Sequence, residues 1–190
     1  MDPLCWTGHP SYTGEKQHLP GTPLIWYLNP LLAFVVGVVH AAVAPVIVVA
    51  GMKPSLILVA VVLVTVLVGF LPGITWAFVG GLAANLLVGD PLGSVPLSLL
   101  VVAAVVAGGE RLLGRMSWIY PILAVGVGSL VADAASLAIG QLVGDAPPLT
   151  GVPIDIMLGA AMLNAGIAGI LLIPARLLVL RYGPDEAPAW

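Results

Sequence analysis

Long apolar runs that are almost free of charge constrain this chain more than any motif does. Only 8% of its 190 residues are charged, whereas a soluble domain carries roughly a quarter. Crossing the apolar core of a bilayer as an α-helix takes about 20 residues. The sequence therefore predicts an all-α fold, a polytopic six-helix transmembrane bundle with helices at about residues 26–50, 55–71, 72–88, 95–108, 118–143 and 153–180.

The basic residues indicate how such a bundle is oriented. Cytoplasmic loops of membrane proteins carry the excess of Lys and Arg. With six helices and both termini in the cytoplasm, Lys53 lies outside and the other five basic residues lie inside: Lys16, Arg111, Arg115, Arg176 and Arg181. We expect three parts: a polar, Pro/Gly-rich segment at 1–25, interfacial or disordered, a membrane domain at 26–181, and a short cytoplasmic tail at 182–190.

Several classes of function lack the residues they need. A formal net charge of −3 without clusters argues against a nucleic-acid partner. Cys5 is the only cysteine, which excludes an internal disulfide and a cysteine-based metal cluster. The chain has no GxSxG, HExxH or phosphate-loop motif. We therefore expect no enzyme activity, no cofactor and no metal.

Small residues recur at every fourth position in three of the runs. Because the hydrophobic effect does not hold helices together inside lipid, such stripes favour close helix packing. They either pack the bundle internally or dock a helix of another membrane protein, for which the first helix is the candidate if it lies at the edge. The stripes are Ala33, Gly37 and Ala41; Gly73, Ala77 and Gly81, continued by Ala84; and Ala124, Gly128, Ala132, Ser136 and Gly140.

Four polar residues fall inside apolar runs. Asp133 is the one carboxylate well inside a run, where a charge costs roughly 2.5–3.5 kcal/mol, so it should face the interior or be protonated. Its possible partners are His40, Asn85 and Asn164. We interpret these residues as a hydrogen-bonded structural network, with a proton or ligand site at Asp133 as the alternative. No second His or Cys is spaced to make His40 a metal ligand.

A charged turn follows the fourth run. It contains Glu110, Arg111 and Arg115, and the two arginines share one face if the helix continues. These charges either set the topology or bind anionic lipid or a cytosolic partner.

Short glycine- and proline-based motifs give the chain a family resemblance. They are Lys53-Pro54-Ser55-Leu56 after the first run, Gly69-Phe70 leading through Gly80-Gly81-Leu82 to Asn85, and Pro91-Leu92-Gly93. With the basic turn and the basic tail, they make residues 29–181 resemble the MreD family, the small integral membrane component of the bacterial rod-shape machinery. The chain departs from the family at Asn85, where members usually have Asp.

The resemblance implies a non-catalytic scaffold in the bacterial inner membrane. Such a scaffold binds MreC and helps link the MreB filament to RodA and its transpeptidase partner; whether it also forms a homo-oligomer is left open. The alternative is the substrate-binding subunit of an energy-coupling-factor vitamin transporter, in which Ala33, Gly37 and Ala41 would dock the coupling subunit. A third hypothesis is a membrane enzyme or proton-coupled carrier centred on Asp133.

Overall fold

The computed structural model describes residues 23–43, 45–48, 51–89, 91–113, 119–144 and 154–182. Within these ranges the predicted all-α class is confirmed. Most of the segment predicted at 1–25 and nearly all of the tail lie outside them, as does Arg115. The helices are α1 (Pro23–Val43), α2 (Leu56–Leu67), α3 (Phe70–Val88), α4 (Ser94–Leu113), α5 (Ile119–Val143) and α6 (Ile154–Tyr182).

Two helices are shorter than the apolar runs that predicted them. The first run extends to residue 50, but α1 ends at Val43, shortly before Pro45. A proline has no N–H to donate and disfavours helical backbone in the residue before it. The second run extends to residue 71, but α2 ends at Leu67 and Gly69 adopts φ 131°. Hydrophobicity therefore marked the apolar stretches correctly but not where their helices stop.

Four helices, α3 to α6, are long and apolar enough to cross a membrane. The described residues therefore support a helical membrane protein. The described side chains of α1 cover Leu28–Val43, and α2 spans Leu56–Leu67; both stretches are shorter. The 12 residues of α2 rise about 18 Å, which is less than the ~30 Å hydrocarbon core. A helix of this length does not cross a bilayer by itself.

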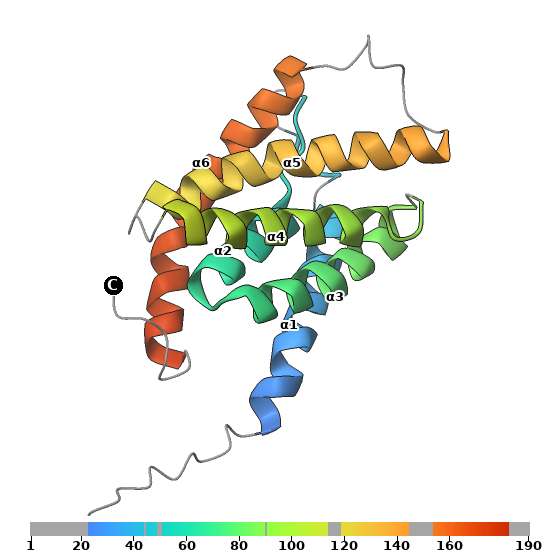
Figure 1. Cartoon of the computed structure of the whole chain (residues 1–190). Helices are drawn as coiled ribbons and strands as arrows, with labels where there is room; N and C mark the ends of the chain where they lie inside the picture. The colour runs from blue at the N-terminus through green and yellow to red at the C-terminus, as the bar shows by residue number, and fades with distance from the viewer. Residues whose placement is uncertain are drawn as a thin grey trace, which may run out of the picture.

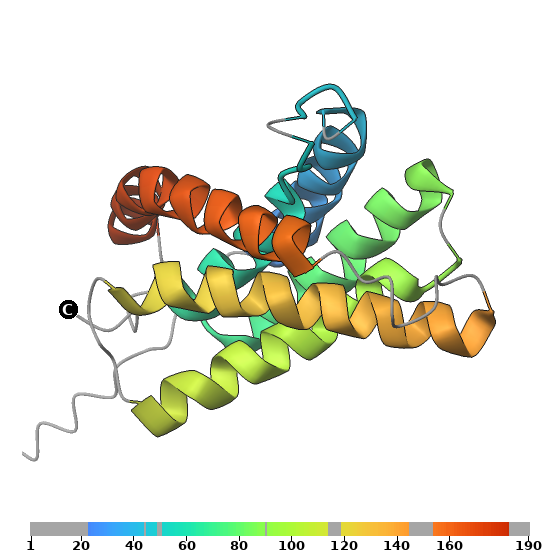
Figure 2. The ribbon, with the colours of Figure 1, turned by 90° about the horizontal axis from the view of Figure 1, so that it is seen from above.

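The short helix α2 lies at the centre of the molecule. It contacts each of the other five helices, which follow one another around it as α1, α3, α4, α5 and α6. Figures 1 and 2 show α3, α4 and α5 running side by side, with α1 and α6 crossing them steeply. Ile57, Val59, Val61 and Val62 of α2 are at most 1% exposed. A helix without a polar side is thereby almost completely enclosed by protein.

The enclosure of α2 is open on one side. No contact joins α1 to α6 among the described residues. The less buried residues of α2 lie on one stripe at a spacing of four. Leu56, Ala60 and Val64 are half-buried, and Val68, the residue after the helix, is exposed. We call the surface along this stripe the open side of α2.

Helices α1 and α3 approach each other through two glycines. A β-carbon added to Gly37 would fall on the Gly80 carbonyl oxygen and lie 3.0 Å from the Ala83 β-carbon. A β-carbon added to Gly80 would lie 2.9 Å from the Ala33 carbonyl oxygen. The Ile57 side chain, whose Cδ1 would lie 2.7 Å from the same Gly80 β-carbon, could move aside, but the two carbonyl oxygens belong to the backbone and could not. The α1–α3 contact thus depends on the absence of side chains at these two positions.

We predict that Gly37→Ala lowers the stability of the purified protein by about 1–3 kcal/mol, because overpacking forces the two backbones apart. Thermal unfolding in detergent measures this effect. Gly166→Ala is the matched control, since Gly166 is an exposed helical position in α6 where a β-carbon meets no atom within 4 Å. Equal unfolding midpoints for the two variants would contradict the predicted close contact.

Candidate functional site

Buried polar groups meet where α2 begins. The Ser55 backbone N–H donates to Asn164 Oδ1 at 2.9 Å, and Asn164 Nδ2 donates to Ser129 Oγ at 2.9 Å. Ser55 immediately precedes α2, Asn164 lies in α6 and Ser129 lies in α5. Asn164 is 2% exposed and Ser129 is 3% exposed. One buried amide therefore joins three parts of the chain, and we call these three residues the Asn164 network.

The position of α2 explains why this amide is needed. The first N–H groups of any helix lack partners within the helix, and hydrocarbon offers no water to satisfy them. The Ser55 N–H lies against the interior of α5 and α6, far from their ends, and the Asn164 oxygen supplies its acceptor. Met52 adds a second attachment, because its sulfur occupies the space where Gly159 of α6 would carry a β-carbon. Helix α6 thus holds the segment that leads into α2.

Asp133 lies one turn beyond Ser129 in α5 and is half-buried. Among the described residues, no hydrogen bond or ion pair joins it to His40, Asn85 or Asn164. His40 lies in the last turn of α1, and its buried Nδ1 has no hydrogen-bond partner there either. The predicted polar residues thus do not form one network in the described part of the chain. Asp133 as a proton or ligand site stays a hypothesis.

Asn85 serves the turn at the end of its own helix. Its Oδ1 accepts a hydrogen bond from the Gly93 backbone N–H at 2.6 Å. Gly89 ends α3 in the left-handed conformation, with φ 82°, which a glycine adopts without steric cost. Asn85 is 1% exposed, so the bond is made inside the protein. The amide closes the turn between α3 and α4.

The small-residue stripes of α1 and α3 face helices of the same chain. Ala33 and Gly37 lie against Gly80 of α3, and Ala41 is 8% exposed. In α3, Gly73 lies against Thr65 of α2, Ala77 is fully buried, and a β-carbon on Gly81 would lie 2.8 Å from the Pro96 Cα in α4. These residues pack the fold in this structure.

The stripe of α5 is divided between the interior and the surface. Ala124 is 6% exposed, and a β-carbon on Gly128 would lie 3.0 Å from Val102 of α4 and 3.4 Å from Val62 of α2. Further along, Ser136 is exposed. The second half of the stripe therefore reaches the molecular surface.

Two hydrogen bonds between helices were not anticipated from the sequence. Trp76 Nε1 donates to Asn29 Oδ1 at 2.6 Å, joining α3 to α1, and the Tyr120 hydroxyl donates to the Val106 carbonyl, joining α5 to α4. Tyr and Trp usually find a partner for their polar atom when buried. This rule, together with the position of the Asn29 amide near the start of an apolar run, could have predicted a bond between Trp76 and Asn29.

A pocket of about 370 Å³ lies at the end of α4 that carries Arg111. Phe70, Ala107, Glu110 and Arg111 line it. No group of three or more His, Cys, Asp or Glu side chains in the described ranges is arranged to hold a metal ion.

Comparisons with known proteins identify no relative. No protein-family model, no curated protein and no solved structure matches this chain. Function must be argued from the residues themselves.

We predict that Asn164→Ala destabilises the protein by about 1–2 kcal/mol, because the Ser55 N–H and the Ser129 hydroxyl lose their partner inside the bundle. Ser129→Ala should cost less, since the Asn164 oxygen still caps Ser55. Ser98→Ala is the control: the Ser98 hydroxyl is buried but bonds only to Val95 of its own helix.

Unfolding midpoints of these variants and of the Asn164→Ala/Ser129→Ala double variant give the coupling energy between the two side chains. Additive effects would show that the Asn164–Ser129 bond does not stabilise the fold.

Proposed function

We propose that this protein is a non-catalytic scaffold of the bacterial rod-shape machinery in the inner membrane. In this role it binds MreC and helps couple the MreB cytoskeleton to RodA and its transpeptidase partner. Both termini are cytoplasmic and the chain crosses the membrane six times. The sequence motifs that resemble the MreD family and the uneven distribution of Lys and Arg support the proposal.

The observation that carries the proposal is that three asparagine side chains, two of them buried, bond to other groups of the same chain. Asn164 bonds to Ser55 and Ser129, Asn85 bonds to Gly93, and Asn29 bonds to Trp76. A small-molecule site instead needs a few polar groups that converge on the ligand. Because these amides bond within the chain, they stabilise the fold and do not form a ligand site. In a scaffold of this kind, the partner binds at the surface.

If the chain crosses the membrane six times, α2 and the segment before it must together span the bilayer. Residues 51–55, if fully extended, add about 16 Å to the ~18 Å of α2. Non-helical backbone is tolerated at membrane depth where protein covers it. The contacts of Met52 and Ser55 with α6 are compatible with that requirement.

The departure at Asn85 is compatible with the resemblance. The bond that Asn85 accepts from Gly93 needs a side-chain oxygen. Asp and Asn both provide one at the same distance from the backbone. The turn between α3 and α4 can therefore be closed in the same way by either residue.

The packing of α1 disfavours the vitamin-transporter alternative. That reading uses Ala33, Gly37 and Ala41 to dock a coupling subunit, whereas Ala33 and Gly37 lie against α3 and Ala41 is buried. Mass spectrometry of the purified protein tests this point independently. A tightly bound vitamin would favour the transporter subunit over the scaffold.

We predict that MreC co-purifies with the tagged protein from native membranes solubilised in mild detergent, and that depletion of the protein turns rod-shaped cells round. If MreC is absent from the purified material and depleted cells keep their shape, the scaffold assignment is wrong. The vitamin measurement can be made on the same sample.

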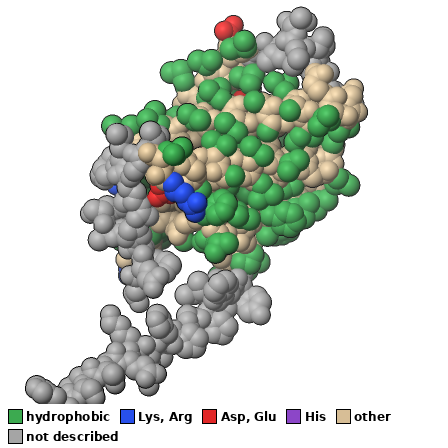
Figure 3. All heavy atoms as spheres, in the orientation of Figure 1, with side chains coloured by type: hydrophobic (Ala, Val, Ile, Leu, Met, Phe, Trp, Pro, Cys, Tyr) green, Lys and Arg blue, Asp and Glu red, His purple; other side chains and the backbone are tan. Residues whose placement is uncertain are grey.

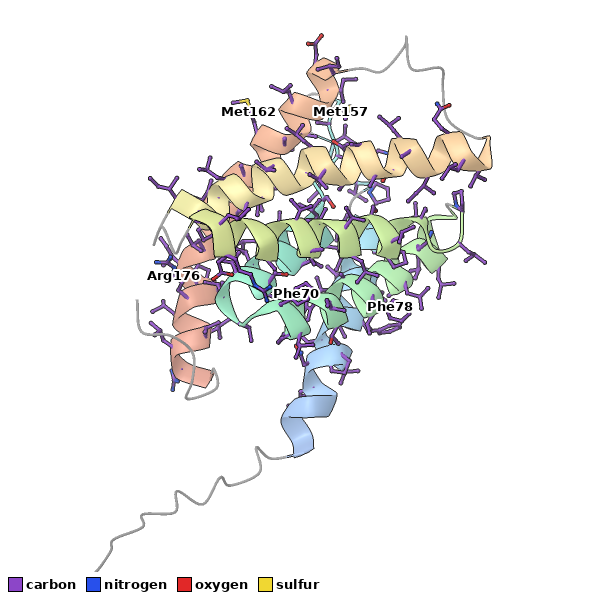
Figure 4. The ribbon with its side chains drawn as sticks, in the orientation of Figure 1. Phe70, Phe78, Met157, Met162 and Arg176 are labelled. Carbon is purple, nitrogen blue, oxygen red and sulfur yellow. The ribbon has the colours of Figure 1, made fainter. Side chains whose placement is uncertain are left out.

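Cysteine crosslinking then locates the partner. With Cys5→Ser as background, single cysteines replace Val64 on the open side of α2, Phe78 on α3 or Met162 on α6. Phe78 is 52% exposed and Met162 is 73% exposed, and Figure 4 shows them on different parts of the molecule. A specific partner crosslinks from one of these faces and not equally from all three.

A further inference from the structure

The pocket at the end of α4 combines both signs of charge with apolar walls. Glu110 and Arg111 come from the last turn of α4, Ala107 from the turn before it, and Phe70 from the start of α3. Its volume of about 370 Å³ lies at the lower end of the range for small-ligand sites, roughly 300–1,000 Å³. The pocket is outside the Asn164 network and has no part in the scaffold proposal.

Helix α5 holds the end of α4, which carries the two charged residues of the pocket. The Tyr120 hydroxyl donates to the carbonyl of Val106, one turn before Glu110. Tyr120 is 8% exposed, and a β-carbon on Gly109 would lie 3.0 Å from its hydroxyl oxygen. The end of α4 is therefore held against α5, and Glu110 and Arg111 project from a fixed backbone.

The two charged side chains differ in their surroundings. Arg111 is exposed and makes no hydrogen bond or ion pair with another described residue. Glu110 is half-buried and already interacts within the chain. A guanidinium presents a fork of N–H donors that matches a phosphate, and a carboxylate accepts hydrogen bonds from an ammonium group. The pocket thus offers complementary contacts to a ligand that carries both groups.

Exposed apolar side chains neighbour the pocket residues in the chain. Phe70 is 39% exposed, and Leu71 and Leu112, next to Phe70 and Arg111 in the chain, are 76% and 88% exposed. Figure 3 shows an acidic and a basic side chain next to each other on this face, with hydrophobic side chains close by, and Figure 4 shows Phe70 at the start of α3 beside α4. Helices α3 and α4 are both long and apolar enough to cross a membrane, and the ends of a membrane-crossing helix lie at headgroup depth.

We propose that this pocket binds the headgroup of an aminophospholipid of the phosphatidylethanolamine type. Arg111 binds the phosphate, Glu110 accepts hydrogen bonds from the primary ammonium, and the glycerol and first acyl carbons lie against Phe70 and Leu71. A phosphatidylglycerol headgroup brings no cation to Glu110. The trimethylammonium of phosphatidylcholine has no N–H to donate to it. The lipid that satisfies both charges is therefore the one with a primary amine.

The test is a lipid titration of the full-length purified protein in detergent, read by native mass spectrometry. We expect phosphatidylethanolamine to bind about tenfold more tightly than phosphatidylglycerol or phosphatidylcholine, the effect of one charge-assisted hydrogen bond. Equal binding of either other lipid overturns the proposal. Soluble phosphoethanolamine should bind far more weakly than the lipid; equal binding would contradict the contact with the membrane.

Two variants separate the charges. Glu110→Gln should remove most of the preference for phosphatidylethanolamine, and Arg111→Gln should weaken all three lipids. The matched controls are Asp155→Asn and Lys53→Gln, both at exposed positions on other elements, and both should bind as the wild type does. Controls as weak as the pocket variants, or pocket variants with unchanged preference, would overturn the assignment. The comparison of the three lipids on the wild type decides the question even if a variant fails to fold.

Discussion

The backbone at the start of α2 is the constraint on which the rest of the structure depends. A helix that begins among the other helices has unpaired N–H groups where no water is available. The Asn164 network answers this by bringing a side-chain oxygen from α6 to Ser55 and a hydroxyl from α5 to the same amide. Because α2 contacts every other helix, fixing its start also fixes the centre around which α1, α3, α4, α5 and α6 are arranged.

Close packing of the helices is the second constraint. It uses small residues that could otherwise have packed against a helix of another protein. Inside lipid, helices gain little from hiding apolar surface, so the approach of backbones matters more. Gly37 against Gly80, Gly73 against Thr65 and Gly81 against Pro96 are approaches of this kind. The small-residue stripes of α1 and α3 are therefore buried in contacts within the same chain. The side chains that stay exposed on these helices are mostly larger apolar ones, such as Phe34 and Phe78.

The interior and the periphery thus have different chemistry. The buried amides Asn85 and Asn164 bond within the chain, and the proposed scaffold role rests on this observation. At the end of α4, by contrast, Glu110 and Arg111 line a pocket next to exposed apolar side chains. The charged pocket therefore lies at the periphery, whereas the core is closely packed.

The sequence by itself determined the class of protein, the positions of its apolar runs, the small-residue stripes and most of the polar residues that matter. It could not determine that α2 has only 12 residues or which stripe faces which helix. In a soluble protein, the apolar face of a helix identifies the interior; here lipid and interior are both apolar, so the pattern does not distinguish them. Asn164 was predicted to bond between helices, but its partners Ser55 and Ser129, 109 and 35 residues away, follow only from the tertiary structure. Long-range pairings of this kind depend on how helices cross, and no local pattern encodes that geometry.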